Sequence, residues 1–413
     1  MGRSYAAGII ALVADGKAPP LKNEHDLSVL SIAALCTLAV IFTVLFLSTL
    51  PVNRDLAAKR DFVTYWATGQ QLVHRGNPYD AAAISRIERD AGFKGGSTYY
   101  MRNAPWALPL ALPLGYVSEQ TAALPWSLIM LGLLVASARM LWKAFGQGGA
   151  RLDWIGYCFP PALFCVILGQ TSILLLLGLA LFLRLHKSRP FVAGAALWFC
   201  TLKPHLFLPF ALVLLVWIAV SRSYRILLGG LAAFAAGAAL TTCIDPAAWG
   251  QYAYYMRTSV VTREFTPCLG DVLRDFMRPS SEWLAFVPCI VACIWALSWF
   301  WPRRRSWDWL ENGNPLMLVS LLVAPFGWIF DQTLAIPAIL FAVSCKPSRT
   351  WMYALALIYL LIELQIGFHV ELHSRTFLWI APTWIVWYLF ARASARKSLA
   401  SRLQPAQTQS AVR

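Results

Sequence analysis

Long apolar stretches, separated by short charged or turn-forming segments, recur along almost the whole chain. A stretch of about 20 apolar residues can cross the hydrocarbon core of a membrane as a helix. Of the 413 residues, 58% are hydrophobic and only 13% are charged, whereas charged residues make up ~25% of a typical soluble protein. The pattern excludes a soluble globular domain and predicts an all-α, polytopic integral membrane protein.

About 12 transmembrane helices are expected from these stretches. The first, 27–50, is expected to be an uncleaved signal-anchor, because the preceding apolar run IIALV is too short for a signal peptide. Prolines inside several later stretches predict kinked or broken helices. The later spans are expected near residues 121–141, 154–168, 171–186, 190–203, 204–220, 225–244, 283–301, 314–330, 332–345, 350–369 and 376–391.

The positions of Lys and Arg predict the orientation in the membrane. The formal net charge is +15, and with a cytosolic N-terminus most of the cations fall in cytosolic segments, while the short outer turns hold only Lys203 and Arg375. This follows the positive-inside rule. We therefore expect a multi-pass plasma-membrane protein with both termini inside, and we attribute the charge to topology and lipid attraction, not to nucleic acid.

The same reading divides the chain into three parts. A cytosolic tail, 1–26, precedes a membrane domain at 27–391, and a basic cytosolic tail follows at 392–413. Two outer segments, 51–120 and 245–282, are too long to be simple turns.

No cofactor is predicted. Six of the nine cysteines lie inside apolar stretches and no CxxC pair occurs, which favours buried packing over metal binding or disulfides. His369, Glu371 and His373 could form a metal site, but we expect none there, because sequence does not show the fixed geometry that a metal needs.

Polar residues that lipid contact does not explain fall in the outer segments. Ionisable residues near a bilayer are costly and usually functional, so their occurrence on one side predicts a single outward-facing polar cavity. The residues are Asp61, Asn77, Arg102, Asn103, Gln170, Lys203, His205, Asp331, Gln332, His369, Glu371, His373 and Arg375.

Asp61 opens a segment, DFVTYWATGQQL, in which Tyr65, Trp66, Gly69 and Leu72 recur at helical spacing. This predicts an amphipathic helix along the outer surface. Asp61 could be an N-cap that stabilises the helix, or a carboxylate base beside aromatic rings on which a sugar stacks. The GNPYD sequence that follows indicates a turn.

Two further outer segments carry cations. RNAPWALPLALPLG, 102–115, is too short and too rich in proline to span, so we expect a re-entrant or interfacial segment. Arg102 at its start could hold a phosphate or could anchor a helix end. Lys203 lies in a tight turn with no carboxylate near it in sequence, and a lipid phosphate would neutralise it.

Together these segments resemble glycosyltransferase family 87. The resemblance rests, in order along 60–345, on DFVTYWATGQQLVHRGNPYD, RNAPWALPLALPLG, GQTSILLLLGLALFL, LWFCTLKPHLFLPFALVLL and APFGWIFDQTLAIPA. It implies a GT-C fold and transfer of a hexose, with mannose as the first expectation, from a polyprenyl phosphate to a lipid or glycan acceptor on the extracytoplasmic face. Asp61 stands where family members carry the proposed catalytic base.

The residue types fit this chemistry. A carboxylate can take the proton of the acceptor hydroxyl, and cations can hold the departing phosphate. Asp61 is the expected base, and a single displacement would invert the anomeric carbon. The residues expected to bind substrate are Tyr65, Trp66, Asn77, Arg102, Asn103, Gln170, Lys203, His205, Asp331, His369 and Arg375.

The alternative is a transporter or lipid flippase. Such a protein is expected to carry ionisable residues near the membrane midplane and two halves of related hydropathy. Glu363 is the main residue of this kind, and the two long outer segments form no matching pair. The sequence therefore favours an enzyme that faces outward.

Overall fold

The computed structural model describes residues 61–92, 101–146, 152–258, 265–278, 280–368 and 374–410. All regular elements in this part of the chain are helices, and none of its residues forms a strand. The predicted all-α class is confirmed. The predicted first span, 27–50, lies outside the described residues.

The first helices, in chain order, are α4 (Phe62–Val73), α5 (Ala81–Asp90), η2 (Pro105–Ala107), α6 (Leu108–Ala111), η3 (Leu112–Tyr116), α7 (Glu119–Ala144), α8 (Trp154–Tyr157) and α9 (Pro160–Leu168). The next are α10 (Ser172–Leu185), α11 (Pro190–Ala196), η4 (Leu197–Leu202), η5 (Pro204–Phe207), α12 (Leu208–Ser221), α13 (Tyr224–Ile244) and α14 (Ala248–Thr258). The last are α15 (Leu269–Met277), η7 (Glu282–Phe286), α16 (Val287–Phe300), η8 (Trp301–Arg303), α17 (Trp309–Leu322), η9 (Ile329–Ala335), α18 (Ile336–Ser344), α19 (Arg349–Gly367), η10 (Arg375–Phe377) and α20 (Ile380–Ser410).

In the described part of the chain, 5 helical stretches are long and apolar enough to cross a membrane: Glu119–Ala144, Pro204–Ser221, Tyr224–Ile244, Glu282–Arg303 and Arg349–Gly367. Three shorter apolar helices, Ser172–Leu185, Pro190–Leu202 and Ile329–Ser344, lie at other predicted spans. The chain is therefore a multi-pass membrane protein, while the count of about 12 spans remains a prediction.

Prolines divide the apolar stretches as expected. Proline lacks a backbone N–H and fits the first turn of a helix better than its interior. Pro160 and Pro190 each begin a helix, and Pro204 begins η5 directly after Lys203. The break between η4 and η5 thus leaves Lys203 in a turn.

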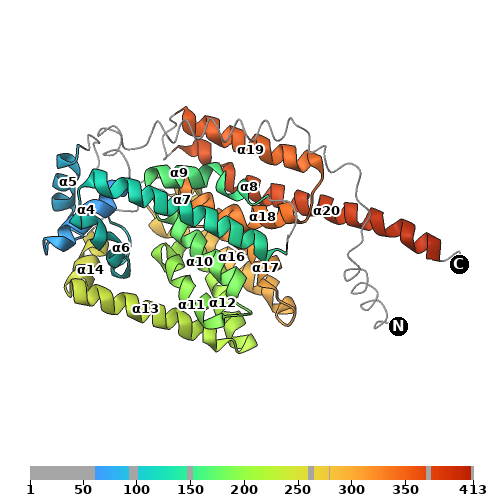
Figure 1. Ribbon diagram of the computed structural model, residues 1–413, viewed down its shortest axis with the longest axis horizontal. Helices are drawn as coiled ribbons and strands as arrows, with labels where there is room; N and C mark the ends of the chain where they lie inside the picture. Colours follow the sequence, from blue (N-terminus) through green and yellow to red (C-terminus); the bar gives the residue numbers. More distant parts are fainter. Residues whose placement is uncertain are drawn as a thin grey trace.

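Long helices run along the molecule, with α4, α5, α6 and α14 gathered at one end, on the left of Figure 1. The helices pack closely where glycine permits. Gly194 on α11 lies against the backbone of Ile226 on α13, and Gly229 on α13 lies against that of Phe191 on α11, so a Cβ at either glycine would overlap the other helix.

The 102–115 segment forms three short helical pieces, η2, α6 and η3, in place of one span. Two contacts fix it: the Thr241 hydroxyl of α13 donates to the Pro105 carbonyl at 2.8 Å, and the Gln70 amide of α4 donates to the Gly115 carbonyl at 2.9 Å. At Gly69 and Gly115, α4 and η3 touch backbone to backbone, and a Cβ on either glycine would overlap the other chain segment. The helix that begins after Asp61 is therefore held on this broken segment.

Candidate functional site

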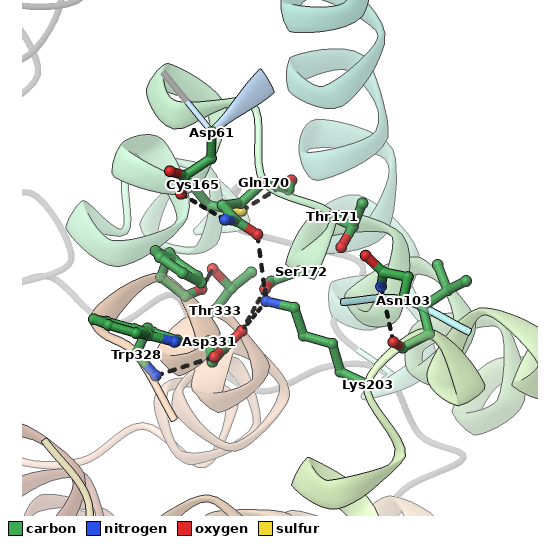
Figure 2. Close-up of polar contacts among 12 residues, drawn as sticks. Asp61, Asn103, Cys165, Gln170, Thr171, Ser172, Lys203, Trp328, Asp331 and Thr333 are labelled. Atoms are coloured by element: carbon green, nitrogen blue, oxygen red, sulfur yellow. Dashed lines mark hydrogen bonds and ion pairs between the residues drawn. The ribbon is translucent and has the colours of Figure 1, made fainter. Parts of the chain in front are cut away.

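Side chains from four separate parts of the chain meet beside the start of α4 (Figure 2). Asp61 directly precedes α4, Gln170 and Ser172 lie where α9 turns into α10, Lys203 lies between η4 and η5, and Asp331 lies in η9. We call these residues the polar junction. The structure thus brings together four predicted site residues, Asp61, Gln170, Lys203 and Asp331.

Lys203 and Asp331 form a buried ion pair at the centre of the polar junction. The Lys203 Nζ lies 2.7 Å from the Asp331 Oδ1, and their side chains are 13% and 2% exposed. Asp331 also accepts a hydrogen bond from the Ser172 hydroxyl at 2.6 Å and one from the backbone N–H of Trp328 at 3.0 Å. A buried charge needs such partners. The carboxylate that neutralises Lys203 is Asp331, which is distant in sequence.

Gln170 connects this ion pair to Asp61. Its amide nitrogen donates to the Asp61 Oδ2 at 2.5 Å, while its amide oxygen accepts from the Lys203 Nζ at 3.4 Å. Gly169 makes this placement possible: it ends α9 at a φ of +75°, and a Cβ there would overlap Phe62. One amide therefore touches both the carboxylate of Asp61 and the cation.

The carboxylate of Asp61 is turned toward the polar junction and away from its own helix. Asp61 occupies the N-cap position of α4, yet its side chain makes no capping hydrogen bond. Burial raises the pKa of Asp61 above its ordinary value, against the opposing effects of the Gln170 hydrogen bond and of the positive charges on Lys203 and Arg102. The orientation favours a chemical role over a capping role.

Aromatic residues border the polar junction. The Tyr65 hydroxyl lies 3.4 Å from both the Gln170 amide oxygen and the Thr171 hydroxyl. Its ring stacks on that of Trp126, with centroids 5.9 Å apart, and the Trp126 indole donates to the Gly169 carbonyl at 2.9 Å. Tyr65, Trp126, Thr171 and Leu202 line a small apolar pocket beside Asn103.

Sequence reasoning missed Trp126, Thr171 and Ser172. Trp126 lies inside a stretch expected only to span the membrane, where a tryptophan one or two turns from the outer end is an ordinary interface residue. Thr171 and Ser172 directly follow Gln170, so their proximity to a predicted site residue was the available signal.

Three predicted residues support the scaffold. The Asn103 amide donates to the Leu202 carbonyl at 2.9 Å, next to Lys203. Asn77 accepts from the Tyr79 backbone N–H at 2.9 Å within its own turn. The Trp66 indole donates to the Val117 carbonyl at 2.9 Å. Of the three, Asn103 acts nearest the polar junction, because it braces the turn that carries Lys203.

The remaining predicted residues lie around the polar junction or apart from it. Arg102 is exposed and close enough to Asp61 to lower its pKa. The ring of His205 packs edge-on against Phe326 at 6.1 Å. Arg375 pairs with Asp275 of α15 at 3.1 Å. Gln332 is buried in η9, and His369, Glu371 and His373 lie outside the described residues.

The sequence model of glycosyltransferase family 87 matches residues 102–330, which is more than half of the chain. The chain belongs to glycosyltransferase family 87. No curated protein and no solved structure matches it. The match includes Gln170, Ser172 and Lys203, while Asp61 precedes it and Asp331 directly follows it.

Family membership decides between the two functional classes considered from the sequence. A family 87 glycosyltransferase is a membrane enzyme that transfers a sugar from a donor to an acceptor. Family membership therefore supports the enzyme over the transporter or flippase. Within the described ranges, no group of three or more His, Cys, Asp or Glu is placed to hold a metal ion. The polar junction brings together a carboxylate, a cation and an amide that contacts both.

Proposed function

We propose that this glycosyltransferase moves a hexose, with mannose as the first candidate, from a polyprenyl-phosphate donor to a lipid or glycan acceptor. The reaction takes place on the extracytoplasmic face of the plasma membrane, with both termini in the cytosol and with inversion at the anomeric carbon. The observation that carries the proposal is the Asp61 carboxylate, which makes no capping bond and is joined through Gln170 to Lys203.

Asp61 acts as the general base. It takes the proton of the acceptor hydroxyl while the hydroxyl oxygen forms its bond to the anomeric carbon. The bond from that carbon to the phosphate oxygen breaks, and its electron pair leaves with the polyprenyl phosphate. Because attack and departure occur on opposite faces of the sugar, a single displacement inverts the configuration.

Lys203 stabilises the departing phosphate, with Arg102 as the second cation. An ammonium has three N–H donors, and the Lys203 Nζ already contacts Asp331, Ser172 and Gln170 at 2.7, 3.2 and 3.4 Å. A phosphate must replace one of these contacts, and the contact to Gln170 is the longest. Donor binding thus releases the Gln170 oxygen, while the Gln170 nitrogen can keep its bond to Asp61.

Tyr65 is placed to contact the sugar through its hydroxyl. The Tyr65 and Trp126 rings stack on each other and are 9% and 7% exposed, so the Tyr65 hydroxyl beside Gln170, and not a ring face, is the group that can reach a sugar hydroxyl. Burial raises the pKa of Tyr65 well above its ordinary value, so its hydroxyl remains a hydrogen-bond donor at neutral pH. The pocket that they line also borders Leu202, next to Lys203.

The test is a transfer assay on the full chain reconstituted with a polyprenyl-phosphate hexose and an envelope lipid extract. Replacing Asp61 by Asn should lower acceptor-dependent release of the lipid phosphate by about 10² to 10⁴. Asp80→Asn is the matched control, since the Asp80 side chain caps α5 through the N–H groups of Ala82 and Ala83 and Asn can keep that role. Full activity of Asp61→Asn would remove the assigned base.

The donor is tested in the same assay. We expect turnover with a mannosyl phosphate donor to exceed turnover with the glucosyl analogue and with a nucleotide-linked sugar. Turnover with the nucleotide sugar alone would contradict the proposed donor class while leaving the family assignment intact.

A further inference from the structure

A second pocket lies at the opposite end of α10 from the polar junction. α10 starts at Ser172 in the polar junction and its last residues, Leu183 to Leu185, line this pocket. The helix has 14 residues, which corresponds to about 21 Å at 1.5 Å per residue. The pocket has a volume of about 670 Å³, with walls from the end of α7, the turn before α11 and the start of α17.

The rim of this pocket concentrates positive charge. Lys143, Arg184, Lys187 and Arg189 all line it and are all exposed. Lys187 lies 3.4 Å from Asp308, whereas Lys143, Arg184 and Arg189 form no ion pair with any residue that the structure describes.

Some cations outside the pocket are matched by acids. Arg139 lies 3.4 Å from Asp153, and Arg392 lies 2.8 Å from Glu311. Exposed cations elsewhere, such as Arg225 and Arg305, also form no ion pair with a described residue, so what distinguishes the pocket is that Lys143, Arg184 and Arg189 line one hollow together.

Apolar side chains line the same pocket. Ala144, Leu183, Leu185 and Leu310 contribute to its walls, next to the cations. His186 is also part of the lining and is 6% exposed; its Nδ1 contacts the Leu183 carbonyl at 2.9 Å, while its Nε2 has no hydrogen-bond partner among the described groups. The pocket thus offers both charge and apolar surface to a single ligand, while the His186 ring is buried against Phe182 and Trp217.

The length of α7 predicts that this pocket lies at the level of the lipid head groups. α7 has 26 residues and is about 39 Å long, which exceeds the ~30 Å hydrocarbon core, so Lys143 near its end reaches the head-group region. The positive-inside rule assigns this end to the cytosol, where acidic phospholipids attract basic groups.

We propose that this basic pocket binds the head group of an acidic phospholipid, with the phosphate among Lys143, Arg184 and Arg189 and the start of the acyl chains against the leucines. A small soluble anion would use the cations alone, whereas a phospholipid uses both surfaces. The site is independent of which sugar the enzyme transfers.

The experiment is a lipid titration of the purified full chain in detergent, followed by native mass spectrometry. The probes are phosphatidylglycerol, phosphatidylcholine and inorganic phosphate. The pocket variant is Lys143→Gln/Arg184→Gln/Arg189→Gln. The matched control, Arg225→Gln/Arg305→Gln/Lys397→Gln, removes the same charge from exposed cations outside the pocket.

We expect the wild type and the control to prefer phosphatidylglycerol over phosphatidylcholine, and the pocket variant to bind phosphatidylglycerol at least about tenfold more weakly. Arg184→Gln alone should weaken binding by about fivefold, which gives an answer even if the triple variant fails to fold. Arg184→Lys/Arg189→Lys should retain the preference for phosphatidylglycerol.

Two results would overturn the proposal. Equal affinity of the pocket variant and the control for phosphatidylglycerol would remove the pocket as the binding site. Displacement of phosphatidylglycerol by an equal concentration of inorganic phosphate would assign the pocket to a soluble anion and not to a lipid.

Discussion

Two lysine–aspartate pairs lie near opposite ends of α10, and their surroundings differ sharply. Lys203 and Asp331 are 2.7 Å apart with side chains 13% and 2% exposed, whereas Lys187 and Asp308 are 3.4 Å apart and 67% and 42% exposed. The first pair shares hydrogen bonds with Ser172, Gln170 and the Trp328 backbone. The second pair is much more open to solvent.

The same two residue types therefore contribute differently to the free energy of unfolding. An exposed pair typically contributes ~0–1 kcal/mol, because water screens it. A buried pair gains little net free energy after desolvation, but removing one partner costs ~3–5 kcal/mol, because the other charge stays buried alone. Burying these two charges requires desolvation free energy that an exposed pair does not require. This agrees with the proposed role of the polar junction, in which the charge on Lys203 acts on the substrate phosphate.

The largest expected effect follows from breaking the buried pair. Asp331→Ala should lower the free energy of unfolding by ~3–5 kcal/mol, because Lys203 would remain buried without its carboxylate. Denaturant unfolding in mixed micelles measures this. Asp331→Ala with wild-type stability would show that water reaches Lys203 freely.

Replacing both partners separates stability from function. Lys203→Met/Asp331→Leu should recover most of the stability lost in Asp331→Ala, since similar apolar volume replaces both charges. Transfer activity should stay at least about 10² below wild type, because the phosphate loses its cation. Recovery of activity together with stability would assign the pair a purely structural role.

The acidity of Asp61 gives a pH-dependent test. Its pKa is raised from 3.8, mainly by burial, so the folded protein holds the proton more tightly than the unfolded chain does. Folding stability from this group is therefore greatest at low pH and declines as the pH rises from 3.8 through the raised pKa. Asp61→Asn should be more stable than wild type at neutral pH.

This difference in the free energy of unfolding should shrink toward zero as the pH falls below 3.8, where the folded and the unfolded wild type both bind the proton. In the transfer assay, kcat/KM should fall on acidification through the same raised pKa, because the base must be ionised. A stability difference that is independent of pH would contradict the buried state of Asp61.

The exposed pair should give the smallest effect. Asp308→Asn should change the free energy of unfolding by less than ~1 kcal/mol and leave transfer unchanged. Asn can keep the N-cap bond that Asp308 accepts from the Leu310 N–H at 3.1 Å. A loss as large as that of Asp331→Ala would remove the contrast between the two pairs.

Much of the fold and part of the site could be predicted from the sequence. Hydropathy indicated the helices and their proline breaks, and the alternation of charge placed the turns of Gln170, Lys203 and Asp331 on one side. Their partners could not be predicted: Lys203 and Asp331 are 128 positions apart, and no local pattern encodes a contact at that separation. Trp126 was missed for a similar reason, since its role depends on Tyr65 and Gly169 packing around it.

The backbone contact between Gly69 and Gly115 limits how far α4 can shift, and therefore how far Asp61 at its start can move. Side chains can change rotamer to absorb a small displacement, but two bare backbones in contact have nothing to adjust. The main chain of the broken 102–115 segment thus fixes the position of Asp61. Any redesign of donor or acceptor preference would have to leave that alignment intact and change other residues that line the small pocket, such as Trp126 and Leu202.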